Sequence, residues 1–165
     1  MLKRTLVFLS LIFLFHGCTK DDICPENTAT TPQLVIVFRN FANPAALKKV
    51  EYLTVATDNE ASIQLINLVA TDSIAIPLNT VSDTTKYKFI RSQIIENDTL
   101  INVDKVSFIY SRKEIYVNRA CGFRDEFENL RPILEDEGSE NWIMNITINR
   151  DTIQDERKAH LTFFH

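Results

Sequence analysis

The chain has 165 residues, 45% of them hydrophobic, and a formal net charge of −4 at pH 7. This length and apolar content suit a single globular domain, whereas the acidic balance argues against a nucleic-acid partner. Glycine occurs only three times, so the sequence has no Gly-rich phosphate-binding loop, no GxSxG nucleophile elbow and no dinucleotide fingerprint.

The first residues have the pattern of a secretory signal. Two basic residues precede an apolar run from Leu6 to Phe15, which Gly17 and Cys18 follow. The run is too short to span a membrane. We therefore expect residues 1–17 to be a cleaved signal peptide and Cys18 to be the lipidated first residue of the mature chain. A plain secretory signal cut elsewhere, with Cys18 an ordinary thiol, is the alternative.

The residues around Cys18 also bear on location. Phe15 and His16 depart from the usual bacterial lipobox, but looser versions occur in Bacteroidetes-type lipoproteins. The segment from Thr19 to Asp22 resembles the signal of a lysine and two acids that directs such lipoproteins to the outside of the outer membrane. We expect a lipid anchor in the outer membrane with surface exposure, and otherwise a position on its periplasmic face. Without residues 1–17, which contain two basic residues and no acid, the mature chain has a formal charge of −6.

The mature chain divides into a tether and one domain. Residues 18–32 are polar and contain two prolines, which predicts an extended lipidated tether. From residue 33 to 165, short runs of β-branched and aromatic residues alternate with polar turns, which predicts strands. No amphipathic helix of three turns is expected, although residues 44–48 and 124–130 could each form one turn. The expected strands are 34–40, 49–56, 62–67, 73–78, 86–94, 105–111, 114–118, 141–149 and 158–164.

The alternation of residues indicates which strand faces are buried. From Trp142 to Ile148, every second residue is apolar, so one face is expected in the core and the other in water. The run Leu34 to Phe38 is apolar throughout, which suits a strand covered on both faces. Pro77 cannot donate a ladder hydrogen bond, so its strand is expected at a sheet edge. These features predict an all-β fold, a single antiparallel β-sandwich of immunoglobulin-like or related Greek-key type, with a small barrel as the alternative.

The number of cysteines predicts a disulfide. With Cys18 lipidated, Cys24 and Cys121 remain in an oxidising compartment, so a disulfide between them is the natural interpretation. A free buried thiol at Cys121 and an intermolecular bond through Cys24 are the alternatives. Neither cysteine has the CxxC spacing of a redox or zinc site.

Several segments together resemble one family of proteins. They are Asp21 to Cys24, Thr31 to Leu34, Asp72 to Leu78, Cys121 to Phe123 and Ala159 to His165. The chain is similar over nearly its whole length to uncharacterised Bacteroidetes lipoproteins that contain a domain of unknown function. The resemblance implies lipidation, the Cys24–Cys121 pairing and a single domain, and it implies no activity.

Residues that could support catalysis or metal binding are few. His160 has no second ligand at HxH or HExxH spacing, so a rim histidine bonded to backbone is expected. The acidic clusters 125–128 and 135–140 lack the alternation of a calcium loop and are expected to be solvated. Most aromatic residues should lie in the core, though an exposed tyrosine ladder could stack on sugars. No catalytic residue, metal site or cofactor is expected, and the protein is not expected to be an enzyme.

Four short motifs match an acid, hydroxyl and apolar pattern that resembles the general O-glycosylation site of Bacteroidetes exported proteins. Their hydroxyl residues are Ser73, Thr84, Thr99 and Thr152. The same pattern also begins strands, so both interpretations stay open. The sequence as a whole predicts a binding or assembly module at the envelope with a protein or glycan partner. A structural subunit of an outer-membrane complex and a divergent hydrolase are the alternatives.

Overall fold

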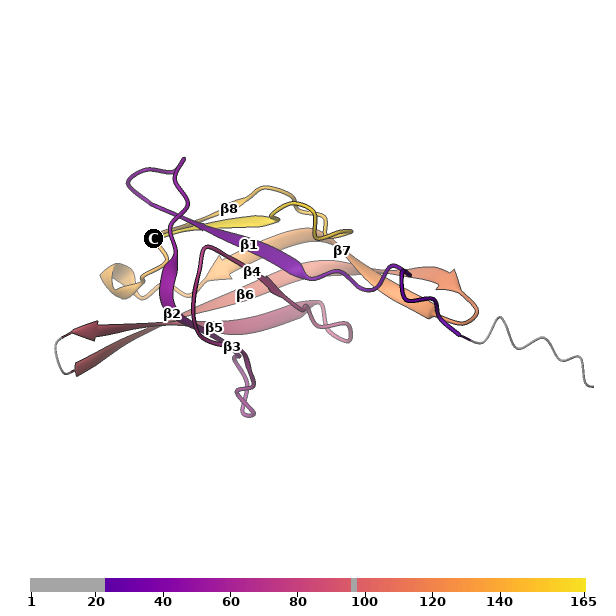
Figure 1. Ribbon diagram of the computed structural model, residues 1–165, viewed down its shortest axis with the longest axis horizontal. Helices are drawn as coiled ribbons and strands as arrows, with labels where there is room; N and C mark the ends of the chain where they lie inside the picture. The colour runs from indigo at the N-terminus through magenta and orange to yellow at the C-terminus, as the bar shows by residue number, and fades with distance from the viewer. Residues whose placement is uncertain (1–22, 96–97) are drawn as a thin grey trace, which may run out of the picture. The chain divides into compact units, whose positions relative to one another are not determined.

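The computed structural model describes residues 23–95 and 98–165 (Figure 1). The chain groups into two compact units. Of the described residues, one unit holds residues 23–29 together with Tyr116–Arg124, and the other holds those within Thr30–Ile115 and Asp125–His165. Within the described ranges no helix is long and apolar enough to cross a membrane.

A four-stranded sheet has the order β4-β1-β9-β8. The central pair, β1 and β9, is parallel, with Ile36 opposite Leu161 and Phe38 opposite Phe163. Figure 1 shows β1 running beside the yellow C-terminal strand. The sheet is therefore mixed, and the expectation of purely antiparallel pairing is wrong at this pair. Its strands are β1 (Leu34–Arg39), β4 (Ser73–Ile76), β8 (Asn145–Ile148) and β9 (Leu161–Phe164).

The second sheet has five strands in the order β3-β2-β5-β6-β7. Strands β3 and β4 are separated only by Asp72, so the chain passes directly from an edge of one sheet to an edge of the other. Strands β7 and β8 form the opposite edges of the two sheets. The chain between them is longer and includes a short 3-10 turn at Gly138–Glu140. The strands of this sheet are β2 (Val50–Thr57), β3 (Gln64–Thr71), β5 (Thr84–Ile95), β6 (Asp98–Asn118) and β7 (Gly122–Leu134).

Both sheets contribute side chains to one hydrophobic cluster. Phe89 of β5 and Phe163 of β9 lie with ring centroids 5.3 Å apart, and Phe38 of β1 packs edge-on against Phe163. All three side chains have no exposed surface. Such aromatic pairs each stabilise a core by about 0.5–1.5 kcal/mol beyond the burial of their area. The strands form two sheets rather than a closed barrel, so the fold is all-β as predicted and the barrel alternative is wrong.

The first strand differs from its sequence pattern. Leu34, Ile36 and Phe38 are fully buried, whereas Val35 and Val37 are only half-buried. A run that is apolar at every position therefore has one core face and one partly covered face. The strand expected at 73–78 lies at a sheet edge as predicted, because β4 is the last strand of its sheet, although it ends at Ile76, before Pro77.

Residues 124–130, which by their sequence could form one helical turn, are instead part of strand β7. Phe127 and Leu130 are both buried, and their spacing of three imitates a helix. Asn129, which lies between them, has a φ of 58° and interrupts the alternation of the strand. The two strands expected at 105–111 and 114–118 are one continuous strand, β6.

The smaller unit contains the turn between β6 and β7. The side-chain oxygen of Asn118 accepts hydrogen bonds from the backbone N–H groups of Ala120 and Cys121, and Gly122 takes a φ of 72°, which favours glycine. Cys121 is joined to Cys24 by a disulfide. Tyr116 and Phe123 form an exposed edge-to-face pair with centroids 5.4 Å apart.

Candidate functional site

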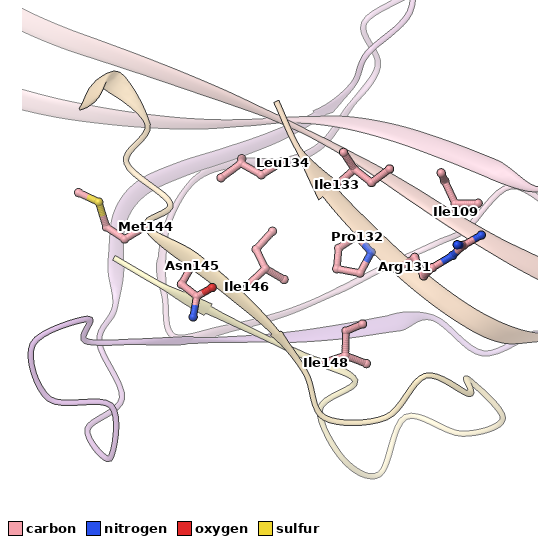
Figure 2. A pocket seen from close by; sticks show the side chains of 9 residues that line it. All are labelled: Ile109, Arg131, Pro132, Ile133, Leu134, Met144, Asn145, Ile146 and Ile148. Carbon is pink, nitrogen blue, oxygen red and sulfur yellow. The ribbon is translucent and has the colours of Figure 1, made fainter. Parts of the chain in front are cut away.

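An apolar groove of about 550 Å³ lies between β7 and β8, the edge strands of the two sheets (Figure 2). Strand β8 and the residue before it supply Met144, Ile146 and Ile148. Strand β7 supplies Pro132 and Leu134. A cavity of this volume is in the range that proteins use for ligands and for short segments of partners.

The groove exposes residues on the core-facing side of β8. Ile148 is paired across strands with Leu161, and paired residues lie on the same face of a sheet. Leu161 has no exposed surface, yet Ile148 is 43% exposed and Met144 is 56% exposed. The predicted apolar face of β8 therefore exists, but the described part of the chain leaves Met144 and Ile148 on it exposed.

The chain itself covers the adjacent part of β7. Phe127 and Ile153 exchange two backbone hydrogen bonds of 3.1 and 2.7 Å, and the Leu130 N–H donates to the Asp151 carbonyl at 2.9 Å. Ile153 is fully buried. Residues 151–153 thus bond to the edge of β7 and place one apolar side chain in the core.

Arg131 gives the groove a cation at its rim. Its side chain is exposed, and it has no hydrogen-bond or ion-pair partner among the described residues. In Figure 2, Arg131 and Met144 lie toward opposite ends of the groove. The surface therefore combines an apolar floor with one unpaired positive charge.

A second, smaller hollow of about 160 Å³ is lined by cationic residues, among them Lys48, Lys49 and Arg91, together with His165. The Arg91 guanidinium lies over the Trp142 ring, 5.4 Å from its centroid. The Nε atom of Arg91 and the Nδ1 atom of His165 are buried without a hydrogen-bond partner. Ordered water satisfies such atoms in many proteins, so this hollow is a weaker candidate than the groove.

Asp104 anchors the chain beside this cluster. Its carboxylate is fully buried and accepts backbone N–H hydrogen bonds from Ile143 at 2.7 Å and from Trp142 at 3.3 Å. Burial raises the pKa of this carboxyl, although these hydrogen bonds, Asn141 and nearby Arg91 act in the opposite direction. Asp104 positions the segment that leads into β8, so its role is structural.

His160 occupies the core rather than the rim, so that part of the sequence-based expectation is wrong. It has no exposed surface, and its Nδ1 atom accepts the Val35 backbone N–H at 3.0 Å. The expected backbone partner is present. Burial, with a smaller contribution from Arg150, lowers the pKa of the imidazole. His160 lines neither the groove nor the cationic hollow.

The covalent sites predicted from sequence fall in different places. Cys18 lies outside the described residues. Cys24 and Cys121 are bonded in the smaller unit, 97 residues apart in sequence. Among the glycosylation-like positions, the side chains of Ser73 and Thr99 are exposed, while those of Thr84 and Thr152 are half-buried.

Metal-binding clusters of three or more His, Cys, Asp or Glu side chains do not occur within residues 23–95 and 98–165. The aromatic residues divide in two groups. Tyr87, Phe89, Phe108 and Tyr110 are in the core, and Tyr116 and Phe123 are exposed. Of these six side chains, the exposed pair is the part that could contact a ligand.

Sequence reasoning missed the groove. It placed Met144, Ile146 and Ile148 on an apolar face and took that face to be covered. One usable signal was Pro132, because a proline within an apolar strand-like run indicates an edge strand. The exposure of β8 has no local signal, since it depends on which strands lie at the ends of the two sheets.

The match to a family model comes from residues 52–165, which carry both edge strands of the groove and Cys121 but not Cys24. The family is described as a family of unknown function, DUF6452. A comparison with curated proteins finds no match, and a comparison with solved structures finds none. The match spans well over half of the chain, and the protein therefore belongs to the DUF6452 family.

Proposed function

We propose that the protein is a lipid-anchored module of the bacterial cell envelope that binds a protein partner through the groove between β7 and β8, and that it is not an enzyme. The anchor is Cys18 after removal of residues 1–17, in an outer membrane of Bacteroidetes type. The basic and apolar residues before Cys18 support this location. Residues 20–22 support display on the outer surface.

The proposed architecture of the binding domain is a single β-sandwich of Greek-key type. Its support is the shared core, in which Phe89 of one sheet contacts Phe163 of the other. The parallel β1–β9 pair makes this a mixed sandwich rather than an antiparallel one.

The observation that carries the proposal is the incompletely covered apolar face of β8, where Met144 and Ile148 are exposed. Burying a side chain such as isoleucine stabilises a protein by about 1.5–3 kcal/mol relative to exposing it. Ile148 forgoes much of this although its cross-strand partner Leu161 is fully buried, and Met144 is also more than half exposed. A partner that covers them gains that stabilisation on binding, and Arg131 adds a charge for orientation.

A glycan partner is the second candidate. The exposed Tyr116–Phe123 pair supports it, because aromatic faces and edges of this kind stack on sugar rings. If the protein is instead a structural subunit of an outer-membrane complex, it would contact the rest of that complex through the same groove. A hydrolase has the least support, since its candidate base His160 is buried and bonded to Val35.

Two variants of the full chain test the proposal. Cys18→Ala is expected to release the protein from membranes or to leave an uncleaved precursor, and lipid labelling that persists in this variant would refute the anchor. Ile148→Glu places a charge in the groove and is expected to convert the mildly extracted protein from a larger assembly to a single chain on native gels.

The matched control for the groove is Val81→Glu, because Val81 is 85% exposed and does not line the groove. This control is expected to migrate like the wild type. If the wild type, Ile148→Glu and Val81→Glu all migrate as single chains, the partner-binding proposal fails. A Tyr116→Ala variant that alone loses binding to cell-surface polysaccharide would favour the glycan candidate instead.

A further inference from the structure

The disulfide shortens the tether that would join the domain to the membrane. The bond between Cys24 and Cys121 holds their Cα atoms 4.9 Å apart, and Cys24 is six residues after Cys18. A chain of six residues spans at most about 20 Å. The Cα atom of Cys121 therefore stays within about 25 Å of that of Cys18. Without the bond, the chain from Cys18 to the start of β1 at Leu34 would allow about 55 Å.

The smaller unit, to which the tether is bonded, carries exposed apolar side chains. Tyr116 and Phe123 are 60% and 66% exposed, and they form the edge-to-face pair described above. Ile23 precedes the bonded Cys24 and is 77% exposed. Figure 1 shows the indigo N-terminal segment beside the turn between β6 and β7. Three large apolar side chains of this unit are thus kept within reach of the anchor.

The hydrogen bonds of the unit keep its two segments in place. Asn118 holds the turn through the backbone N–H groups of Ala120 and Cys121. On the other segment, the Thr28 N–H donates to the Pro25 carbonyl at 3.0 Å. The disulfide then joins the two segments covalently. The exposed rings are therefore carried by an ordered turn, and a surface that binds them does not have to order this backbone first.

The charge of this unit is opposite to that of the whole chain. Its described residues include two cations, Arg119 and Arg124, and one acid, Glu26, which gives a formal charge of +1. Arg119 is exposed and has no hydrogen-bond or ion-pair partner within the described part of the chain. Aromatic rings favour the headgroup level of a bilayer, and basic side chains are attracted to anionic headgroups. This combination suits a lipid surface.

Resting on the lipid anchor proposed above, we propose that Tyr116, Phe123 and Arg119 form a membrane-contact surface. This surface holds the smaller unit against the bilayer that carries the acyl chains of Cys18. The two rings enter the interfacial layer, and the guanidinium group meets lipid phosphates. Because the acyl chains already attach the protein, the contact is an intramolecular step at high effective concentration and needs little affinity of its own.

Photo-cross-linking in intact cells tests the contact. In the full-length protein, p-benzoylphenylalanine replaces Phe123 and keeps an aromatic ring at that position. The same replacement at Phe41, which is 55% exposed and belongs to the other unit, is the matched control. After irradiation, mass spectrometry identifies the molecules bonded to each position. We expect membrane lipid bonded at position 123 with a yield roughly tenfold above that at position 41, because burial of an aromatic side chain shifts an equilibrium by about this factor.

A double variant tests whether the neighbouring side chains hold the unit on the lipid. With the photoreactive residue at position 123, Tyr116→Thr and Arg119→Glu remove the second ring and reverse the charge. The lipid yield is expected to fall roughly fivefold or more, since one basic residue near an anionic surface accounts for about that factor. The matched control, Phe41→Thr with Lys86→Glu, makes comparable changes at exposed residues of the other unit and is expected to leave the yield unchanged.

An unreduced gel shows whether each variant keeps the Cys24–Cys121 bond and with it the structure of the smaller unit. If the double variant loses the bond, Arg119→Gln replaces it, with the same expected direction.

Fractionation of the same cells separates the membrane contact from the anchor. Protein in the membrane fraction without lipid bonded at position 123, or with a yield that the folded variant leaves unchanged, would overturn the contact and retain the anchor. Bonding at position 123 only to polysaccharide would also overturn it and would favour the glycan candidate, and bonding only to protein would overturn it in favour of a protein partner at this site. Protein in the soluble fraction would overturn both the contact and the anchor.

Discussion

The Nδ1 atom of His160 accepts a hydrogen bond from the backbone N–H of Val35 at 3.0 Å. The backbone N–H of His160 donates in turn to the Val35 carbonyl at 2.8 Å. Because an accepting Nδ1 carries no proton, the buried imidazole is neutral with its proton on Nε2. The last segment of the chain is thereby joined to β1 by two bonds at one residue.

This pairing predicts a dependence of stability on pH. Burial lowers the pKa of His160 below its ordinary value of 6.5, so the unfolded chain binds this proton more readily than the folded protein. The stabilisation is complete above pH 6.5 and is lost as the pH falls through the lowered value. His165, whose pKa burial also lowers, acts in the same direction. Chemical unfolding at several pH values between about 7.5 and 5 should show a falling free energy of unfolding.

The variant His160→Asn separates the contribution of His160 to this pH dependence from that of His165. The Asn oxygen can accept the Val35 N–H and does not titrate in this range, so the fall with pH should be smaller than in the wild type. His165→Asn serves as the parallel comparison. An identical slope for His160→Asn and the wild type would contradict the assignment.

A second prediction concerns Asp104. Replacement by alanine leaves the buried N–H groups of Trp142 and Ile143 without an acceptor, at a cost of about 1–3 kcal/mol for each unsatisfied group. Asp104→Ala should therefore lower the free energy of unfolding by about 2–5 kcal/mol. Asp104→Asn keeps one acceptor oxygen and should lose less. Equal losses in the two variants, measured by urea unfolding, would show that the hydrogen bonds are not the cause.

The disulfide allows a third prediction. Cys24 and Cys121 close a loop with a separation of 97 residues, and the loop-entropy model assigns about 4–5 kcal/mol to a loop of this length. Cys121→Ser should lower the free energy of unfolding by a few kcal/mol, and Cys24→Ser together with Cys121→Ser should lower it no further. An unreduced digest of protein from the envelope should contain the joined peptides. Titratable thiols after unfolding without reductant would argue against the bond in cells.

The fourth prediction concerns glycosylation. A glycosylating enzyme needs an accessible hydroxyl, and the side chains of Ser73 and Thr99 are exposed whereas those of Thr84 and Thr152 are half-buried. We expect modification at Ser73 or Thr99 before the other two positions. Intact-mass measurement of the envelope protein should show added hexose units that disappear in a Ser73→Ala, Thr99→Ala double variant. Modification confined to Thr84 and Thr152 would contradict this order.

Local patterns predicted most of the strands because alternation and β-branched residues act over a few positions. They failed at β7, where Asn129 at positive φ makes Phe127 and Leu130 resemble a helical pair. The same limitation applies to Tyr52 and Leu68, whose positive φ angles accompany register shifts between β2 and β3. No residue type in those runs announces a bulge.

The candidate site was less accessible to sequence reasoning than the strands. Alternation correctly gave β8 an apolar face, but whether that face is covered depends on the order of strands in two sheets. That order joins residues far apart in sequence, as when Val35 meets His160. Pairing over such separations is set by the whole core and not by any local segment.

The place of β9 between β1 and β8 has a consequence for how the protein is made. This strand follows all the others in the chain, yet it holds the middle of its sheet and pairs with the first strand. During synthesis β1 and β8 have no partner in common until residues 161–164 have left the ribosome. The four-stranded sheet therefore forms late in folding, because its centre depends on a contact between the first and the last strands.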